Sequence, residues 1–529
     1  MPPGSGRRRD LHAGGISVFA KLGSGERKKS GGGRRKACRR WIIDASGRVG
    51  RFPMQLKVAV LGGGVTGLAA CYYLARSSLA SKVILLEGSH RLGGWIHSTR
   101  TEDGAVFEHG PRGIRPAGLV GKNTLLMISE LGLEADVLPV PGDHPASKNR
   151  YLYVGGSLHK LPSGLKGIFQ TVPPFSSPLV WSGLKELLAP RGTEPDETIH
   201  AFVARRFGQE MADIAIDSLC RGVFAGDSRA LSIRSCFPAL FLAERKHGSV
   251  MLGMTLAKKE ASPVDCRLIR QAQEGHWSQW SLRGGLETLP QSLASFLRER
   301  GVKIHCNAPV KRLDRTTSGS WQIALQDGNM EADHVISALP ARALADLLPA
   351  RFEPLIQDLL AIQAVSVAVV NLQYENAQLP VTGFGHLVPS FEDRPLLGIV
   401  YDSVAFPEQN GRQGSATRLT VMLGGAWFTS HLGDPDTIPH SELLSRAQEA
   451  VRKHLGISAE PVRSIVKVHQ SCIPQYTLGH WKHMESATSQ LKQHNLPLSL
   501  VGASYGGVSV NDCIFSAQTA VSRLVGGVS

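Results

Sequence analysis

The chain has 529 residues, enough for two or three domains with a sizeable buried core. Apolar residues make up 42% and charged residues 19%, as in a soluble or peripherally attached globular protein, and only 6% are aromatic. The net charge of +15 is not a nucleic-acid signature, because residues 1–53 hold 14 Lys and Arg against 3 Asp and Glu, which leaves +4 for the rest. We therefore expect no nucleic-acid partner.

The basic segment 1–53 is rich in Gly, Arg and Ser and includes the clusters Arg7-Arg8-Arg9 and Arg34-Arg35-Lys36. It has too few apolar residues to form a core, which predicts a disordered extension. Two interpretations stay open. The segment is either an Arg-rich organelle presequence or an upstream extension of the gene model, since Met54 lies just before the first predicted strand.

The cysteines are dispersed and form no CxxC pair, which argues against zinc ribbons and thioredoxin-type motifs, and no metal site is expected. Low cysteine density without a secretory signal predicts reduced thiols. No window approaches 18 uninterrupted apolar residues, so a transmembrane helix is not indicated. The eight cysteines are Cys38, Cys71, Cys220, Cys236, Cys266, Cys306, Cys472 and Cys513.

A nucleotide-binding unit is predicted from residue 57 onward. Residues 57–61 (KVAVL) indicate a buried parallel strand, residues 62–67 match GxGxxG, and residues 68–75 indicate a helix. In such a unit Gly62 makes the tight turn and Gly64 lets the backbone approach a pyrophosphate. Gly67 lets helix and strand pack closely, and the helix N-terminus offers N–H groups to the phosphates.

The residues that follow favour FAD over NAD. A second strand at 82–86 (KVILL) ends before Glu87, 20 residues beyond Gly67, where an acid can accept hydrogen bonds from ribose hydroxyls. The sequence EGSHRLGGW at 87–95 then adds an Arg and a Gly-Gly turn, and EHGPRG at 108–113 adds a second Gly-rich stretch. A nicotinamide dehydrogenase needs neither, whereas a flavoprotein must hold a longer cofactor.

With E-x(3)-R-x-G-G after the second strand, the chain resembles the flavin amine oxidase superfamily. Residues 54–529 are similar, more narrowly, to the animal, oxygen-dependent protoporphyrinogen oxidase family. The chain departs from that family's pattern at Gly506, where the family has Glu, and at Phe515 and Ala517, where it usually has an acid and Gly. The strings that carry the likeness are RLGGW at 91–95, GPRGIRPAG at 110–118, NRYLYVGG at 149–156, DSLCRGVFAGDSR at 217–229, QWSLRGGLETLP at 279–290, DHVISALP at 333–340, GFGHLVPS at 383–390, CIPQYTLGHW at 472–481 and GASYGGVSVNDC at 502–513.

The resemblance implies six-electron oxidation of protoporphyrinogen IX to protoporphyrin IX in haem biosynthesis, with FAD accepting hydride and O2 reoxidising it to give H2O2. It also implies one FAD per chain, a membrane surface, a homodimer and a contact with ferrochelatase. The implied location is the mitochondrial inner membrane, peripheral, on the intermembrane-space face. Two alternatives are an amine oxidase or carotenoid-desaturase-like flavoenzyme, and a non-catalytic flavin-binding scaffold.

The site residues follow from the fingerprint and from the resemblance together. No acid–base residue is assigned, because the flavin carries the chemistry, and His386 is left out because strand alternation turns it away from the neighbours of Phe384. Cys513 lies outside the Gly-Gly-Cys context of covalently flavinylated monoamine oxidases, so FAD is expected to be non-covalent. Arg112 is expected to hold the cofactor segment or to form a buried ion pair, and Arg150 to pair with a substrate propionate. The expected cofactor-binding residues are Gly62, Gly63, Gly64, Val65, Thr66, Gly67, Glu87, Arg91, Trp95, Gly110, Pro111, Arg112, Gly113, Val310, Trp481, Ala503, Val508, Ser509 and Val510. The expected substrate-binding residues are Arg150, Leu219, Gly222, Ala225, Phe384, Gly385, Leu387 and Met422.

The expected fold class is α/β (mixed α+β), with a Rossmann-like FAD-binding domain, an interleaved sheet-based substrate domain and a helical membrane-binding domain. The stretches LHKL at 158–161 and LKGIF at 165–169 suit amphipathic helices, which either pack on the body or attach to a membrane. The expected parts are 54–142, 283–348 and 467–529 for FAD, 143–154, 259–282 and 349–466 for substrate, and 155–258 for the helices. Within them we expect a helix at about 289–300 and strands at 302–305, 334–338 and 498–502 in the FAD part, and strands at 151–154, 365–372 and 419–423 in the substrate part.

Overall fold

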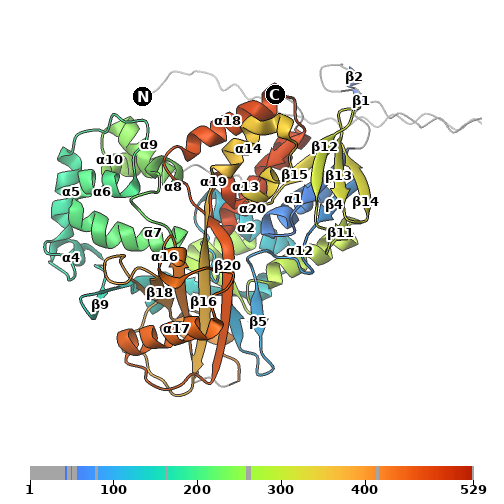
Figure 1. Ribbon diagram of the computed structural model, residues 1–529. Helices are drawn as coiled ribbons and strands as arrows, with labels where there is room; N and C mark the ends of the chain where they lie inside the picture. Colours follow the sequence, from blue (N-terminus) through green and yellow to red (C-terminus); the bar gives the residue numbers. More distant parts are fainter. Residues whose placement is uncertain are drawn as a thin grey trace, which may run out of the picture. The chain divides into compact units, whose positions relative to one another are not determined.

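The computed structural model describes residues 42–43, 49–50, 56–77, 82–162, 164–257, 264–412 and 416–526. The chain divides into two compact units, Met1–Met54 and Gln55–Ser529. In the first unit only the antiparallel pair β1 (Ile42–Ile43) and β2 (Val49–Gly50) is described, so the predictions for the basic extension fall outside the described residues. All other elements belong to the second unit (Figure 1).

A five-stranded parallel sheet forms the part that is expected to bind the nucleotide, in the order β11-β4-β3-β15-β21. All five strands were predicted, and the first two have the predicted bounds. The inner strands β3, β4 and β15 are mostly apolar and buried because both faces of the sheet are covered, as is usual for parallel sheets, whereas the edge strand β11 exposes Lys303 and His305. The bounds are Lys57–Leu61 for β3, Lys82–Leu86 for β4, Lys303–His305 for β11, His334–Ser337 for β15 and Leu498–Leu500 for β21.

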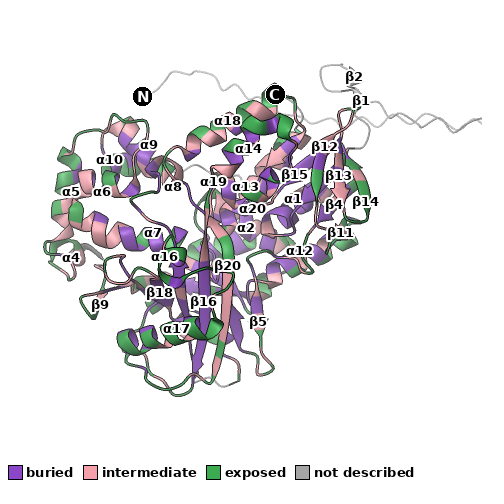
Figure 2. Cartoon of the chain, in the orientation of Figure 1, coloured by how far each residue is buried: buried purple, intermediate pink, exposed green. Residues whose placement is uncertain are grey.

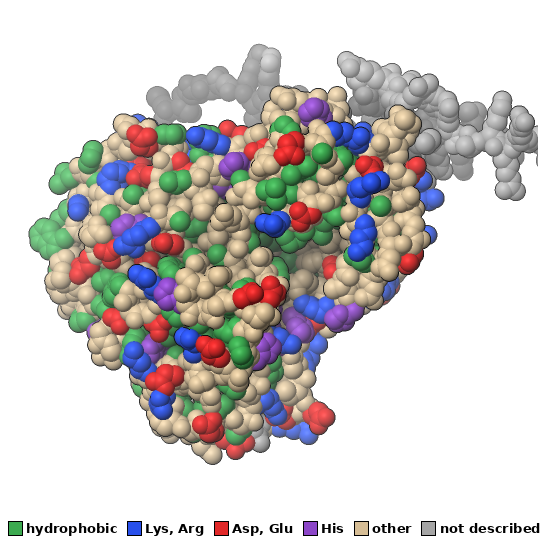
Figure 3. All heavy atoms as spheres, in the orientation of Figure 1, with side chains coloured by type: hydrophobic (Ala, Val, Ile, Leu, Met, Phe, Trp, Pro, Cys, Tyr) green, Lys and Arg blue, Asp and Glu red, His purple; other side chains and the backbone are tan. Residues whose placement is uncertain are grey.

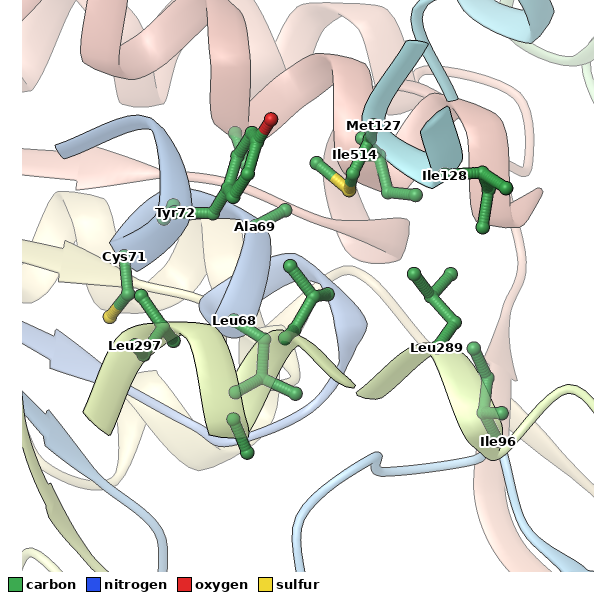
Figure 4. Packing of buried hydrophobic residues seen from close by; sticks show 14 of the residues in the cluster. Leu68, Ala69, Cys71, Tyr72, Ile96, Met127, Ile128, Leu289, Leu297 and Ile514 are labelled. Atoms are coloured by element: carbon green, nitrogen blue, oxygen red, sulfur yellow. The ribbon is translucent and has the colours of Figure 1, made fainter. Parts of the chain in front are cut away.

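Helices α1, α2, α11, α12 and α20 pack into the core on one face of this sheet. Leu68 of α1, Leu289 of α12 and Ile514 of α20 meet in that core (Figure 4), and the predicted helix at 289–300 is confirmed as α12. The helices span Val65–Arg76 (α1), Gly118–Glu130 (α2), Arg267–Glu274 (α11), Thr288–Glu299 (α12) and Val510–Val525 (α20).

The other face is covered by α13, α14, α18 and a small antiparallel sheet, β12-β13-β14. Trp321 is fully buried there and donates from its indole N–H to the Pro497 carbonyl at 3.0 Å. The bounds are Arg312–Arg315 (β12), Trp321–Leu325 (β13), Gly328–Ala332 (β14), Ala341–Ala345 (α13), Glu353–Leu360 (α14) and His480–Gln493 (α18).

A second sheet of seven strands, in the order β20-β16-β19-β18-β17-β8-β9, forms the expected substrate part. Its pairs are antiparallel except β17 with β8, and α17 (His440–Leu455) packs on it. The predicted strands at 151–154, 365–372 and 419–423 are confirmed. The bounds are Tyr151–Val154 (β8), Ser157–Lys160 (β9), Ala364–Tyr374 (β16), Gly385–Leu387 (β17), Leu396–Val400 (β18), Thr417–Gly425 (β19) and Arg463–Pro474 (β20).

Three expectations about these parts differ from the structure. Residues 158–161 were expected in a helix, but Ser157–Lys160 form β9, because Gly155 and Gly156 turn the chain back at positive φ. The expected boundary at 466/467 cuts through β20, which pairs with β16 as far as Pro474. Residues 267–282 do not join the seven-stranded sheet, since α11 packs in the first core and β10 (Trp277–Leu282) pairs with β7 (Val137–Pro141).

Short helices gather in a third region, at the left of Figure 1. Among the described residues, no helix combines the length and apolar character needed to cross a membrane. The elements are α4 (Gly164–Phe169), α5 (Leu179–Leu188), α6 (Ile199–Phe207), a π-helical turn (Met211–Ile216), α7 (Asp217–Phe224), α8 (Ile233–Cys236), α9 (Pro238–His247) and α10 (Val250–Leu256). The remaining short elements include β5 (Ser98–Arg100), β6 (Val106–Glu108), α3 (Pro145–Lys148), α15 (Asp402–Ala405), α16 (Phe428–Leu432) and α19 (Ala503–Gly506).

A buried ionic cluster joins the helices of this region. Arg206 of α6 has no exposed surface and contacts Glu186 of α5 and Glu244 of α9, which are equally buried. Arg206 Nε donates to Glu186 Oε1 at 2.8 Å, and Nη1 donates to Glu244 Oε1 at 2.9 Å. Glu186 also accepts from the Ser249 hydroxyl at 2.6 Å, at the start of α10. One guanidinium therefore connects α5, α6 and α9, and Glu186 extends the cluster to α10.

Candidate cofactor and substrate site

The fingerprint glycines occupy the turn between β3 and α1. Gly62 has φ +95°, and a Cβ built on Gly67 would lie 1.9 Å from the Gly62 carbonyl oxygen, so the third glycine lets the helix approach the turn. For a Cβ on Gly64 the nearest atom is Gly94 Cα at 3.8 Å. Gly64 is also the N-cap of α1, and no side chain caps that end, so Val65 and Thr66 begin the helix with amides available to an anion.

Glu87 follows β4 and contacts the same turn. Its Oε2 accepts from the Gly63 amide at 2.6 Å, and its Oε1 accepts from the Ser89 amide at 2.8 Å. A carboxylate has about four acceptor positions, so these two bonds leave capacity for ribose hydroxyls. Glu87 thus fixes the fingerprint loop and lies directly beside the turn where the nucleotide is expected.

The Arg91 side chain folds back onto the Gly93-Gly94 turn instead of pointing away from it. Its guanidinium donates to the Leu92 carbonyl at 3.0 Å, to the Ile96 carbonyl at 3.2 Å and to the Gly94 carbonyl. The turn lies against the fingerprint, because the Gly93 amide donates to the Gly63 carbonyl at 2.9 Å. Trp95 follows the turn with 43% of its surface exposed.

The second Gly-rich stretch, Gly110-Pro111-Arg112-Gly113, passes close to that turn, since a Cβ on Gly110 would lie 2.1 Å from the Trp95 carbonyl oxygen. Arg112 is buried and lies 3.5 Å from Asp402, so the structure contains the ion pair that was one of its two expected roles. Sequence reasoning did not find Asp402, because its partner Arg112 is far away in the sequence.

Most of the C-terminal residues expected to bind the cofactor lie around the start of α20, which packs beside α1. Ala503 begins α19, Val508 packs in the core of the helical region, and Ser509 caps α20, whose first residue is Val510. Two other expected residues come from elsewhere. Trp481 of α18 stacks on Arg234 at 3.5 Å, and Val310 packs on the opposite face of the parallel sheet.

Arg150 precedes β8 and stacks on the Phe384 ring, with its guanidinium carbon 4.9 Å from the ring centroid. Among the described residues, no carboxylate lies within ion-pair distance of Arg150. Burial and the nearby Arg115 lower the pKa of its guanidinium. A half-buried guanidinium without a counter-ion suits an anionic ligand.

The other expected substrate residues lie on α7 and on the strands beside it. Gly222 of α7 faces Leu387 of β17, because a Cβ on Gly222 would lie 2.8 Å from Leu387 Cδ2. Leu219, one turn away, is exposed on the same side. Gly385 precedes Leu387 with φ +148°, where a Cβ would meet the Ile399 carbonyl at 2.3 Å.

Ala225 ends α7 in the left-handed conformation and belongs to a small core cluster against which Met422 of β19 packs. His386 points away from this group and is hydrogen-bonded to Tyr401 at 2.7 Å and to His454 at 2.9 Å, so the expected alternation is confirmed.

Figure 3 shows a hollow near the middle of one face, with hydrophobic side chains at its floor. Sequence reasoning did not single out two buried polar residues, Gln475 and Tyr476, although both lie within the string 472–481.

Comparison with known proteins defines the class. Residues 65–525 match the family model described as flavin containing amine oxidoreductase. The solved structure of cyclohexylamine oxidase from Brevibacterium oxydans shares the fold, with a TM-score of 0.62 at 14% identity over 89% of this chain and 99% of that one. The chain belongs to the flavin containing amine oxidoreductase family and is a flavin-dependent oxidoreductase.

The comparisons also place the chain within that family. Protoporphyrinogen oxidases of Macaca fascicularis and Homo sapiens are 58% and 57% identical to it. In both cases the match covers 89% of this chain and 98% of the relative. This chain therefore belongs with the animal protoporphyrinogen oxidases.

Proposed function

We propose that this chain oxidises protoporphyrinogen IX to protoporphyrin IX, with FAD as hydride acceptor and O2 as the final electron acceptor, reduced to H2O2. The observation that carries this proposal is the identity of 57–58% over nearly the whole length of animal enzymes of that name. Purified protein supplied with protoporphyrinogen IX should produce porphyrin fluorescence and consume O2. Flavin-loaded protein that does neither would contradict the proposal.

The residues present suit FAD. The start of α1 has no side-chain cap, Gly64 presents backbone without a side chain at that end, and Glu87 has acceptor capacity for a ribose. When bound, the flavin supplies the hydride acceptor. The chain's own contribution is to hold the pyrophosphate at the start of α1 and to hold the substrate beside the surface where Gly222 of α7 packs against Leu387 of β17.

We expect the FAD to be non-covalent, so the purified protein should be yellow and should release intact FAD after acid or heat. Cys513 lies buried in α20, and burial raises the pKa of its thiol to about 11, although a hydrogen bond with Thr66 acts in the opposite direction. A neutral thiol is a poor nucleophile for a flavin linkage. Flavin absorbance that stays with the denatured chain would refute this expectation.

We propose that Arg150 binds a propionate of the substrate, on the support of its half-buried position over Phe384 and its lack of an acidic partner among the described residues. Such a contact acts far from the carbon that loses hydride, so it should affect KM and leave kcat nearly unchanged. A charge-assisted hydrogen bond is worth about 1.5–3 kcal/mol, so Arg150→Ala should raise KM roughly 10- to 150-fold.

Arg150→Lys should recover only part of this loss, because an ammonium cannot copy the planar two-pronged donor. Steady-state kinetics with FAD content measured in parallel test the assignment. A wild-type KM at full FAD occupancy would show that Arg150 lies outside the substrate site.

We also propose that the helical region attaches the protein to a membrane surface. The support is an apolar patch on α4, α5, α9 and α10, which appears as hydrophobic side chains at the left margin of Figure 3. Lys185 and Lys246 are exposed on the same helices, where their stems can follow the apolar surface while the charges stay in water. The patch consists of Ile168, Phe169, Trp181, Leu184, Leu187, Leu188, Leu242, Met251, Leu252, Met254 and Leu256.

The mitochondrial inner membrane, on its intermembrane-space face, is the location that we propose for this attachment. The homodimer and the contact with ferrochelatase stay predictions of the resemblance.

Leu188, which is 86% exposed, offers a direct test of the patch. Burying a leucine side chain is worth about 1.5–3 kcal/mol, so Leu188→Glu should weaken binding to phosphatidylcholine vesicles by roughly 10-fold or more. Val462, exposed at the far end of β20, gives a matched control, because Val462→Glu changes the charge equally outside the patch. Equal effects of the two substitutions in vesicle co-sedimentation would rule out the patch.

A further inference from the structure

The connection that follows β20, residues 475–477, contacts both the cofactor part and the substrate part of the site. Gln475 is 7% exposed and Tyr476 is 2% exposed, although both side chains are polar. Burying a polar group costs free energy unless it is hydrogen-bonded. The partners of these two side chains therefore reveal what the connection holds.

Tyr476 holds the loop that leads into α20. Its hydroxyl donates to the Ala503 carbonyl and accepts from the Gly507 amide at 2.8 Å. Ala503 is the first residue of α19, and Gly507 directly follows its last residue. One hydroxyl is therefore hydrogen-bonded to both ends of the segment 503–507. The Tyr476 ring stacks on His480 with centroids 4.2 Å apart, and His480 Nε2 lies 3.4 Å from the Tyr505 carbonyl.

Gln475 points the other way and holds the end of α7. Its Nε2 donates at 2.9 Å to the carbonyl of Phe224, the last residue of that helix. A Cβ on Gly226 would lie 2.3 Å from Gln475 Oε1, so the amide is packed directly against the chain that leaves α7. The helix held in this way carries Leu219 and Gly222.

The backbone of the connection is fixed as well. The Tyr476 carbonyl accepts from the Ser232 amide at 2.8 Å, and Leu231 pairs with Thr477. The Gln475 amide donates to the Gln363 carbonyl at 2.8 Å. Because the backbone of the connection is hydrogen-bonded on both sides, its side chains are held in fixed positions, which suits a positioning role.

We propose that Tyr476 is a positioning residue for FAD and that Gln475 is a positioning residue for the substrate-facing helix α7. The inference rests on the proposed function, because it takes segment 503–510 as cofactor-facing and α7 as substrate-facing. In this proposal Tyr476 affects the binding of FAD, and its neighbour Gln475 affects the binding of the substrate, each independently of the other. Removal of either side chain should change one binding constant and leave the other unchanged.

Tyr476→Phe removes the hydroxyl and keeps the ring that stacks on His480. It leaves the Gly507 amide without its partner and should weaken FAD binding roughly 10-fold, with an altered visible spectrum of the bound flavin. Tyr374→Phe is the matched control. Tyr374 is as buried as Tyr476 but belongs to the core of the seven-stranded sheet, outside segment 503–510, so the removal of its hydroxyl should leave the FAD Kd unchanged.

Gln475→Met keeps the side-chain volume and removes the amide. It should raise the KM for protoporphyrinogen IX roughly 5-fold or more, with the FAD Kd and kcat nearly those of the wild type. A merely structural role predicts a different pattern. Both variants would then lose FAD affinity and substrate affinity together, in proportion to their loss of Tm, and that pattern would overturn the proposal.

The FAD Kd is measured by quenching of flavin fluorescence on addition of the flavin-free protein, without any porphyrinogen. The role of Tyr476 is therefore tested even if the proposed substrate is wrong, and an unchanged Kd in Tyr476→Phe would overturn it. If that variant does not fold, hydrogen exchange in the flavin-free wild type decides. We expect the Gly507 amide to exchange slowly before FAD is added. Fast exchange that becomes slow only when FAD binds would show that Tyr476 does not hold the loop in place, and it would overturn the proposal.

Discussion

Gly67→Ala should yield protein without bound flavin. The added methyl would lie 1.9 Å from the Gly62 carbonyl oxygen, which is backbone and cannot rotate away. Helix α1 must then move from the turn, so the amides at its start no longer converge on a phosphate. Flavin content per chain, measured from the ratio of flavin to protein absorbance, should fall to near zero, with a lower Tm.

Two further glycine variants separate the fold from the cofactor. Gly64→Ala meets its nearest atom at 3.8 Å, so it should keep the wild-type fold yet weaken FAD binding on the order of 100-fold by blocking the phosphate approach. Gly183→Ala in α5, with Met251 at 3.4 Å, should keep full FAD and a Tm at or slightly above that of the wild type. Full FAD occupancy in Gly64→Ala would show that the phosphates do not pass there.

Arg206→Met should cost about 3–5 kcal/mol of stability, because it leaves the buried Glu186 without its cation and leaves Glu244 paired only with Arg205. Arg446→Met is the matched control. Arg446 pairs with Glu442 on the surface of α17, so its loss should cost at most about 0.5 kcal/mol. The difference in Tm between each variant and the wild type measures both effects. Similar shifts would show that the buried cluster contributes no more than a surface ion pair.

The loss in Arg206→Met should depend on pH. Burial raises the pKa values of Glu186 and Glu244, but hydrogen bonds and the two arginines outweigh it, so both values are lowered in the wild type. Carboxyl groups with lowered pKa values stabilise the fold above their ordinary pKa, and that contribution is lost as the pH falls through the lowered value. Without Arg206, Glu186 keeps its hydrogen bonds from Ser249 and Val250 but loses its cation, so its pKa should rise, and the Tm difference from the wild type should narrow as the pH falls from about 7 to about 5.

The parallel sheet could be predicted because its signals are local. The first two strands are apolar runs, and the fingerprint and Glu87 mark the turns that follow them. The edge strand β20 gave no such signal. Most of its residues are intermediate or exposed, as its pink and green colouring in Figure 2 shows beside the buried β16, so it has neither an apolar run nor an alternating pattern. The four residues of β9 are too few to separate helix from strand by periodicity, and only the Gly155-Gly156 turn pointed to a hairpin.

Contacts between residues far apart in the sequence could not be predicted. The sequence offered two roles for Arg112, and only the packing of α15 brings Asp402 to within 3.5 Å of it. In the same way, nothing local to Tyr476 indicates that its hydroxyl meets the Gly507 amide. Arg150 was predicted from the resemblance, but its position over Phe384 depends on the pairing of β8 with β17.

Anaerobic mixing of the purified flavoprotein with protoporphyrinogen IX tests the central claim most directly. If the bound flavin takes hydride from this substrate, its absorbance near 450 nm should bleach during the first turnover, and O2 added afterwards should restore it with formation of H2O2. In the Arg150→Ala variant, the bound flavin should bleach only at a higher substrate concentration. A flavin that stays oxidised in the presence of saturating protoporphyrinogen IX, while other reductants still bleach it, would contradict the account.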